Sequence, residues 1–245
     1  MKSLHHVVKR SAAAAAAAVK ICGLSDEVSL HAAIEGGASF IGFVFVPSSK
    51  RVITIDHALA LLESLPQPTL CRFMRADQAI AEDGHLVLVA LLQNPTDEQV
   101  REVLRLKPLL GLIQLHGDET PARVAEIKML SGLPVMKAIA VATAEDLACV
   151  SSYEKVADML LFDTKIGKSS GGTGKSFDWS LLKGKRFKKP WMLAGGLTPD
   201  NVAEAIKITK AKIVDVSSGV ETKTKSDGTK KDPDKIRIFL REVFY

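Results

Sequence analysis

Long apolar runs and paired cysteines are missing from this sequence. No run of about 18 apolar residues occurs, so no membrane-spanning helix is predicted. The three cysteines, Cys22, Cys71 and Cys149, are odd in number and widely spaced, and none belongs to a Cys-x-x-Cys pair. This spacing argues against disulfides and against a zinc site, and it favours a reducing compartment. We therefore predict a cytoplasmic protein without metal ligands.

Aromatic residues and clustered positive charge are also scarce. Only 5% of the residues are aromatic, and the net charge of +5 is scattered along the chain. A nucleic-acid-binding protein more often has a basic stripe or stacking aromatic residues. The mild positive charge instead fits a small anionic ligand such as a phosphate ester. Neither a nucleic acid nor a membrane is expected as a partner.

What is present suits one globular domain. The chain has 245 residues, of which 47% are hydrophobic and 25% charged, and about 250 residues are typical of a single α/β barrel. Residues 1–18 are rich in alanine and contain no acid. An organelle-targeting peptide, a frayed alanine helix and an appended sequence are all compatible with this segment. We predict an N-terminal extension over 1–18 and one domain over 19–245.

From residue 19 onward, short β-rich runs alternate with helical stretches. Eight such units in strict alternation predict parallel strands joined by helices, and in this length a closed (β/α)8 TIM barrel is favoured over an open doubly wound sheet. Residues 71–85 and 222–231 fit less well and are interpreted as surface excursions. The strands are predicted at 19–22, 39–45, 86–92, 110–115, 134–141, 158–162, 191–194 and 213–216, and the helices at 26–35, 54–64, after 95, 120–128, 143–153, 177–182, 199–208 and 233–243.

Polar residues stand at the carboxyl ends of four predicted strands, where barrel active sites lie. On the first strand Val19 and Ile21 suit the helix side, which leaves Lys20 and Cys22 facing inward. Charged side chains are rarely buried without partners. They therefore form a site or, for Lys20 and Asp215, an ion pair that closes the barrel. The polar residues at the ends of strands four, six and eight are Gln114, His116, Asp163, Asp215 and Ser217.

Two glycine-rich turns follow the last two predicted strands. Glycine lets backbone N–H groups approach a phosphate, and the loops after strands seven and eight are the usual phosphate site of barrels. We predict that Gly195 and Gly196 of the first turn, and Ser217, Ser218 and Gly219 of the second, bind a phosphate group. A third glycine-rich run, 171–175, is either a mobile lid or a flexible loop.

A series of motifs, in order along residues 19 to about 243, resembles the phosphoribosylanthranilate isomerase family. The sequence departs from the family pattern at 1–18, at 71–85, at 222–231 and at 91–94, where Leu-Leu-Gln-Asn replaces an ending of the Phe-Val-Asn type. The motifs are KICGL (20–24), GFVF (42–45) with PSSKR (47–51), QLHGDE (114–119), LFDTK (161–165) with GGTGK (171–175) and FDW (177–179), AGGL (194–197) with PDNV (199–202), and VDVSSGVE (214–221).

The resemblance implies an Amadori rearrangement in tryptophan biosynthesis, in which an anthranilate-bearing phosphoribosyl aldose becomes a 1-amino-1-deoxyketose. This chemistry needs an acid for the ring oxygen and a base for the C2′ proton. By resemblance, Cys22 is the general base and Asp163 the general acid. Lys20, two residues before Cys22, is expected to lower the pKa of the thiol. Asp163 must hold a proton when the ring opens.

The resemblance also implies how the substrate is held. Arg51 matches the family arginine, whose guanidinium suits the anthranilate carboxylate. Asp215 is expected to hold the anthranilate amine or the sugar, with Lys20 beside it. His116 either lines the pocket or has a structural hydrogen-bonding role. The expected partner is the small phosphoribosyl substrate, no metal or redox cofactor is required, and the protein is expected to be a monomer or a homodimer.

Two alternatives stay open. The sister isomerase of histidine biosynthesis runs the same rearrangement with paired aspartates, but here Cys22 occupies the first of those positions. A non-catalytic barrel that binds phosphate ligands would keep the fold without the reaction, and the presence of both Cys22 and Asp163 argues against it.

Overall fold

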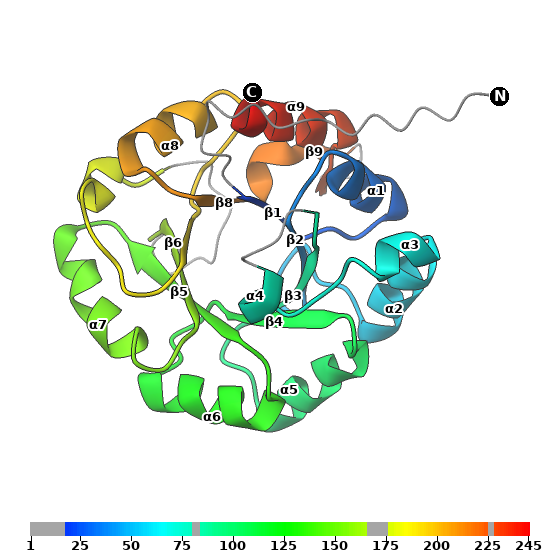
Figure 1. Cartoon of the computed structure of the whole chain (residues 1–245), viewed down its shortest axis with the longest axis horizontal. Helices are drawn as coiled ribbons and strands as arrows, with labels where there is room; N and C mark the ends of the chain where they lie inside the picture. Colours follow the sequence, from blue (N-terminus) through cyan, green and yellow to red (C-terminus); the bar gives the residue numbers. More distant parts are fainter. Residues whose placement is uncertain (1–17, 80–83, 166–175, 225–227) are drawn as a thin grey trace.

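A closed barrel of eight parallel strands forms the centre of the molecule (Figure 1). The computed structural model describes residues 18–79, 84–165, 176–224 and 228–245. Each strand pairs with its neighbours in chain order, and β8 pairs with β1 to close the ring. The predicted (β/α)8 barrel is confirmed, with strand ends within two residues of their predicted places. The strands are β1 (Ala18–Cys22), β2 (Phe40–Val44), β3 (Val87–Leu92), β4 (Leu110–Leu115), β5 (Val135–Val141), β6 (Met159–Thr164), β7 (Trp191–Leu193) and β8 (Ile213–Val216).

Helices surround the barrel, and several begin where the sequence supplies a capping side chain. Asp26, Thr54, Thr96 and Thr120 each accept a hydrogen bond from the backbone N–H three residues on, which satisfies a donor that the first helical turn leaves unpaired. The helices are α1 (Glu27–Glu35), α2 (Ile55–Glu63), α5 (Asp97–Val103), α6 (Pro121–Ser131), α7 (Val150–Tyr153), α8 (Val202–Thr209) and α9 (Pro233–Phe244).

Two predicted helices are shorter than expected. The stretch predicted at 143–153 is a 3-10 helix, η2 (Ala144–Cys149), followed by the single turn of α7. The stretch predicted at 177–182 contains only the 3-10 helix η3 (Trp179–Leu182). Two further 3-10 helices, η1 (Leu104–Leu106) and η4 (Ser218–Val220), lie after α5 and after β8. The first stretch is therefore helical over nearly its predicted length but mostly as a 3-10 helix, and the second is shorter than predicted.

The two faces of the strands form separate apolar layers, as the alternation of residues predicts. Val19 and Ile21 belong to the large layer between the strands and the helices. Val89, Leu112 and Leu161 belong to the smaller layer inside the barrel. The inside of the barrel is therefore a packed core and not a pore.

The segment after α2 closes one end of the barrel, so its interpretation as a surface excursion is wrong for the described part. It contains α3 (Gln67–Leu70) and α4 (Ala76–Ala79), and Figure 1 shows α4 over the middle of the ring. Ala76 is 1% exposed and packs in the interior layer with the first residues of three strands, Phe40, Val87 and Ile213. The segment lies across the end where the strands begin, because the small apolar side chain of Ala76 fits between them.

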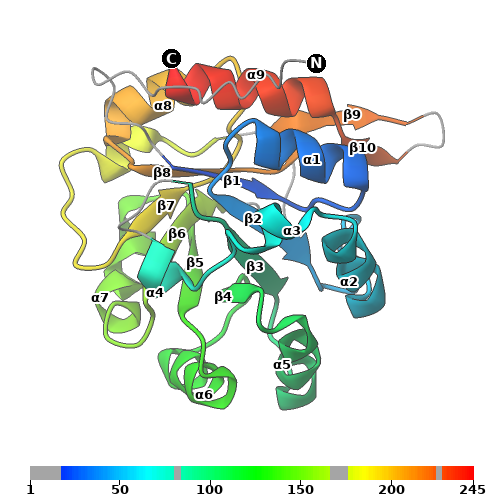
Figure 2. The same ribbon diagram turned by 45° about the vertical axis from the view of Figure 1, so that its right-hand side comes forward.

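The stretch at 222–231 is also more ordered than a surface loop. Its described residues belong to an antiparallel hairpin of β9 (Glu221–Lys223) and β10 (Thr229–Lys231), which lies beside the start of α9 (Figure 2). Lys231 is only 3% exposed. The stretch is therefore a hairpin at the surface, of which Lys231 is the buried residue because an ionic contact with Glu221 holds it inward.

A buried ion pair lies at the seam where the barrel closes. Lys20 of β1 and Asp215 of β8 are partners in the strand register. Their side chains are 0% and 8% exposed, and Lys20 Nζ lies 2.9 Å from Asp215 Oδ1. Gly42 of β2 leaves room for the lysine, since a Cβ atom there would lie 3.1 Å from Nζ. The ion pair that the sequence left as an alternative is therefore present.

Replacing Lys20 by methionine should destabilise the fold strongly. The change would leave the Asp215 carboxylate buried without its cation, which typically costs about 3–5 kcal/mol of unfolding free energy. The double variant Lys20→Met/Asp215→Leu should recover most of that loss, because a packed apolar pair has no charge to desolvate. Urea denaturation of both variants measures this, and a loss below about 1 kcal/mol in the single variant would contradict the structural role of the pair.

Candidate active site

The predicted catalytic and polar residues meet at the carboxyl ends of the strands. Cys22 is the last residue of β1, and Asp163 is the penultimate residue of β6. His116 and Ser217 directly follow β4 and β8. Because all strands are parallel, these ends share one rim of the barrel. The prediction that these residues lie at one end of the fold is confirmed.

The Cys22 thiol is held in an apolar setting beside a buried charge. Cys22 is 5% exposed and packs with Val44, Val46 and Leu91. Burial raises the pKa of the thiol, and the opposing effect of Lys20 is smaller. Lys20 does lower the pKa as expected, but its charge is compensated by Asp215. The pKa of the Cys22 thiol is therefore raised overall, and the prediction that it is lowered is wrong.

Lys20 itself stays charged at this seam. Burial alone would lower the pKa of Lys20, but Asp215 and, to a smaller extent, Cys22 outweigh burial and raise it. The positive charge next to the thiol is therefore a fixed feature of the barrel wall. A thiolate that forms at Cys22 would have a cation beside it, which stabilises the charged form.

On the other side of the rim, Asp163 belongs to a chain of hydrogen bonds. Asp163 Oδ2 lies 3.1 Å from His116 Nε2, and Asp163 Oδ1 accepts a bond from the Thr164 N–H at 2.7 Å. Gln114 Nε2 lies 2.9 Å from His116 Nδ1. If the buried amide donates to Nδ1, the ring carries its proton on Nε2 and donates it to Asp163. His116 thus has a partner at both ring nitrogens, which agrees with the structural hydrogen-bonding role that the sequence left open.

Arg51 lies in a bidentate contact with Glu221. Arg51 Nε donates to Glu221 Oε1 at 2.5 Å, and Arg51 Nη2 donates to Glu221 Oε2 at 3.0 Å. Glu221 Oε1 also accepts a hydrogen bond from Lys231 Nζ at 2.8 Å. Burial alone would raise the pKa of Glu221, but Arg51 and Lys231 together lower it from its usual 4.5 to about 2. The carboxylate is therefore ionised at any physiological pH.

The path of the Arg51 side chain explains one glycine of the first motif. Gly23 follows Cys22 with a φ of +78°, and a Cβ atom there would lie 2.6 Å from Arg51 Cδ. Glycine thus allows the Arg51 side chain to pass directly over the end of β1. Arg51 and Cys22 are consequently brought to neighbouring places on the rim.

The two glycine-rich turns after β7 and β8 pack against each other. A Cβ atom on Gly219 would lie 1.9 Å from the carbonyl oxygen of Leu197, so the turns touch through their backbones. Gly195 has a φ of +86°, and a Cβ atom there would lie 3.0 Å from Asp163 Oδ1. Only glycine fits both places, and the turns are therefore fixed relative to Asp163.

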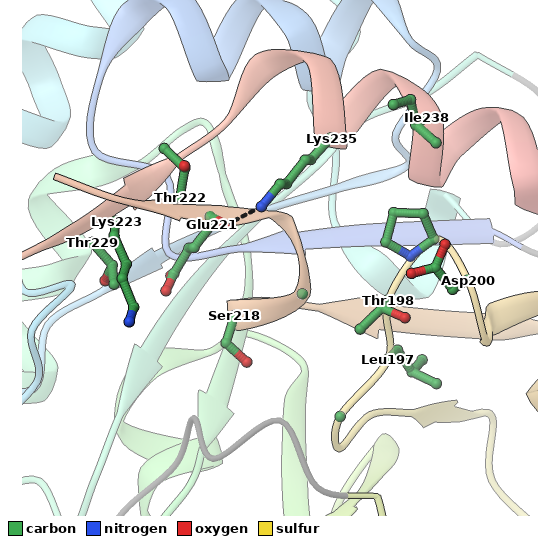
Figure 3. A pocket seen from close by; sticks show the side chains of 13 residues that line it. Leu197, Thr198, Asp200, Ser218, Glu221, Thr222, Lys223, Thr229, Lys235 and Ile238 are labelled. Atoms are coloured by element: carbon green, nitrogen blue, oxygen red, sulfur yellow. Dashed lines mark hydrogen bonds between the residues drawn. The ribbon is translucent and has the colours of Figure 1, made fainter.

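A cavity of about 620 Å³ lies along these turns (Figure 3). Of the five residues predicted to bind phosphate, Gly196, Ser218 and Gly219 line it. Gly195 and Ser217 do not, and the Ser217 hydroxyl instead donates to the carbonyl oxygen of Cys22 at 3.1 Å. Cys22 and Asp163 are also absent from the lining. The cavity thus marks the side of the rim with the glycine turns and not the space between the catalytic pair.

Sequence reasoning gave no role to several residues that shape this rim. In the sequence, Glu221 is only the last residue of a family motif, and Lys231 is one residue of a polar stretch, so neither was assigned a role. A signal was available, because Lys231 directly precedes the Asp232 cap and Pro233 of the last helix, which fixes its position. The glycine-rich run at 171–175 lies outside the described residues.

The described ranges offer neither a metal site nor a membrane-spanning helix. No group of three or more His, Cys, Asp or Glu side chains in the described ranges is placed to hold a metal ion. None of the described helices is long and apolar enough to cross a membrane.

Comparison with known proteins gives one consistent result. Residues 69–242 match the family model for N-(5'-phosphoribosyl)anthranilate (PRA) isomerase. The N-(5'-phosphoribosyl)anthranilate isomerase of Paracoccus denitrificans is 48% identical over 228 residues, which make up 92% of this chain and 96% of that protein. The crystal structure of the phosphoribosyl anthranilate isomerase of Thermotoga maritima has a TM-score of 0.75 at 32% identity and covers 93% of this chain and 98% of its own.

A second crystal structure of such an isomerase is informative because of its ligand. It contains reduced 1-(o-carboxyphenylamino)-1-deoxyribulose 5-phosphate. Its TM-score is 0.71 at 30% identity, and it covers 93% of this chain and 98% of its own.

Acid should weaken the fold through Glu221. Because the pKa of this carboxyl is lower in the folded protein than in the unfolded chain, its contribution is present above about pH 4.5 and is lost as the pH falls toward 2. We expect Glu221→Gln to reduce the slope of unfolding free energy against pH in that window. Denaturant titrations at several pH values measure it, and an unchanged slope would show that Glu221 is not held by Arg51 and Lys231.

Proposed function

This chain belongs to the N-(5'-phosphoribosyl)anthranilate isomerase family, and from that premise we propose roles for the residues at its barrel rim. Its activity is the isomerisation of N-(5'-phosphoribosyl)anthranilate, a step of tryptophan biosynthesis. The proposal concerns which side chains act as acid and base, and which hold the two ends of the substrate.

Asp163 is the proposed general acid and Cys22 the proposed general base. Asp163 donates a proton to the ring oxygen as the C1′–O bond breaks, which leaves an open-chain Schiff base and an Asp163 carboxylate. The Cys22 thiolate then removes the C2′ proton, and the electron pair of that C–H bond forms the enolamine. Tautomerisation of the enolamine gives the 1-amino-1-deoxyketose. The two groups thus perform opposite proton transfers on one substrate.

The contrast between the two environments is the observation that supports this assignment. Cys22 is buried among apolar side chains beside the Lys20 charge, whereas Asp163 is partly exposed and hydrogen-bonded to His116. Two titratable groups in such different surroundings, on one rim of a barrel, are typical of an acid–base pair. The carboxylate formed at Asp163 would be stabilised by the His116 N–H bond.

The remaining site residues are proposed to hold the two anionic ends of the substrate. The ligand in the related crystal structure has a carboxyl group on its ring and a phosphate at its other end. We assign the carboxylate to Arg51 and the phosphate to the turns at Gly195-Gly196 and Ser217-Ser218-Gly219. His116, Lys20 and Asp215 complete the pocket wall. Because Lys20 contacts Asp215 Oδ1, Asp215 would use Oδ2 for the anthranilate amine or the sugar.

Further expectations about the whole protein are part of the proposal. The isomerase domain is proposed to span residues 19–245, with 1–18 as an extension, and to act without a metal or redox cofactor. The exposed, unpaired Cys71 and Cys149 support a reducing compartment such as the cytoplasm. The proposed state is a monomer or a homodimer, which light scattering of the purified protein would decide.

Loss of either catalytic group should slow turnover strongly while binding survives. Removing a general acid or base typically costs about 10²–10⁴-fold in rate, so we expect kcat of Cys22→Ser and Asp163→Asn to fall by that order with KM within about threefold. The fluorescence of the anthranilate group, followed after adding freshly made phosphoribosylanthranilate, measures the reaction.

Cys149→Ser is the matched control, because it makes the same change at an exposed cysteine. It should leave turnover unchanged. Near-normal turnover in both Cys22→Ser and Asp163→Asn would reject the assigned roles. A folded wild-type protein without activity would instead direct the next assay to the histidine-pathway substrate.

The residual reaction of Asp163→Asn should speed up as the pH rises above neutrality. The wild type needs a thiolate and a protonated acid at once, and a rise in pH favours the first and disfavours the second. In Asp163→Asn only the thiol is left to titrate, and its thiolate fraction grows about tenfold per pH unit below the raised pKa of Cys22. We expect kcat/KM of this variant to rise between about pH 7 and 9. The double variant Cys22→Ser/Asp163→Asn should lack the rise, and a flat profile of Asp163→Asn would exclude Cys22 as the base.

A further inference from the structure

Lys231 is a buried cation in the rim that the proposed reaction does not use. It lies on β10 opposite Glu221 of β9, and its side chain is 1% exposed. Its Nζ atom donates to Glu221 Oε1 at 2.8 Å, to the Ser217 carbonyl at 2.9 Å and to the Ser217 hydroxyl oxygen at 3.2 Å. Three acceptors around one nitrogen use all three N–H bonds of an ammonium group. The contacts therefore fit the charged form of Lys231.

Glu221 stands between this ammonium and the guanidinium of Arg51. Its Oε1 atom accepts from both Lys231 and Arg51, and its Oε2 atom accepts from Arg51 alone. The Glu221 side chain is 7% exposed, and that of Arg51 is 22% exposed. Arg51 is thus the most exposed of the three side chains, and its remaining N–H bonds are donors that an anionic ligand could use.

The charges of the three groups decide what Arg51 can do. Arg51 and Glu221 alone would form a neutral pair, whose attraction for another carboxylate would be weak. With Lys231 added, two cations and one anion leave a net charge of +1. Because the group is mostly removed from water, this charge is poorly screened, and it acts on an anion that approaches Arg51.

The geometry of the guanidinium is compatible with a second carboxylate. Glu221 occupies the edge formed by Nε and Nη2. A guanidinium presents another pair of parallel N–H bonds on the edge formed by Nη1 and Nη2. Glu221 can therefore orient Arg51 without blocking the edge that a substrate carboxylate would take.

We propose that Lys231 is a positioning residue for the isomerase: it neutralises Glu221, so that Glu221 fixes Arg51 while Arg51 keeps its attraction for the anthranilate carboxylate. This inference rests on the proposed role of Arg51 in the reaction. The hairpin of β9 and β10, which the sequence suggested to be a surface excursion, is in this view part of the substrate site.

Inhibition by the two halves of the substrate tests the inference. Anthranilate serves as the carboxylate probe and inorganic phosphate as the phosphate probe, and the Ki of each is measured by competition with phosphoribosylanthranilate. We expect Lys231→Met to raise the Ki of anthranilate and the KM of the substrate by about tenfold, because the loss of one charge-assisted contact weakens binding by about that factor. The Ki of phosphate should change by less than about threefold, and Lys231→Arg should restore the Ki of anthranilate.

Lys230→Met is the matched control, since it removes the same side chain from the neighbouring, exposed position of the hairpin. It should leave both Ki values unchanged. If Lys231→Met changes neither Ki, or changes both equally, the inference is overturned and Lys231 is only structural.

Arg51→Met separates this inference from the proposed function on which it rests. If Arg51→Met leaves the Ki of anthranilate unchanged, the proposed role of Arg51 fails and the inference fails with it. If Arg51→Met raises that Ki but Lys231→Met does not, only the inference fails.

If Lys231→Met does not fold, the same change made together with Glu221→Gln tests the inference. In Glu221→Gln there is no buried carboxylate for the loss of Lys231 to leave unpaired. The double variant Glu221→Gln/Lys231→Met should then have a Ki for anthranilate at least about threefold above that of Glu221→Gln, because one positive charge near Arg51 is gone. Equal Ki values in the two variants would overturn the inference.

Discussion

The barrel closes on a buried ion pair, and the position of the reacting groups depends on that closure. Lys20 and Asp215 stand opposite each other where β1 meets β8, with almost no access to water. Two residues further along, Cys22 and Ser217 are joined by the bond from the serine hydroxyl to the Cys22 carbonyl. A shift in the register of this seam would separate both pairs at once. The same contact that completes the fold therefore also fixes the end of β1, where the thiol lies.

Burying a charge costs free energy, and a second buried charge at the rim is compensated in the same way as the pair at the seam. A buried ion needs both a counter-ion and hydrogen bonds to its remaining atoms. Besides the seam, Glu119 and Lys137 form a buried pair at 2.9 Å, and Glu119 also accepts bonds from the backbone N–H groups of Asn94 and Gly117. This pair holds the loop directly after His116. The ion pairs thus tie loops of the rim to the rigid strands, which limits how far the site residues can move.

The sequence predicted the strands and the catalytic rim because these depend on local patterns. Alternating residues such as Val19, Lys20 and Ile21 show which side of a strand faces inward, and the barrel follows from the repetition of strand and helix. Two features depended instead on contacts between distant segments. Ala76 enters the end of the barrel although its own stretch has no strong period, and the raised pKa of the Cys22 thiol reflects burial that no neighbour in sequence reveals. Local composition indicates neither a long-range packing partner nor the extent of desolvation.

If the residues have the proposed roles, the rim binds the two ends of the substrate, and the acid and the base act on the carbons between them. Arg51 stands over the end of β1 beside the hairpin of β9 and β10, whereas the glycine turns follow β7 and β8 and touch each other through Gly219. A molecule with a carboxylate at one end and a phosphate at the other would be held by two charged contacts, and its sugar carbons would lie between them. Two fixed points remove most of the rotational freedom that a single contact would leave. The reaction itself then needs only two proton transfers, which is consistent with a catalytic pair of one thiol and one carboxyl group.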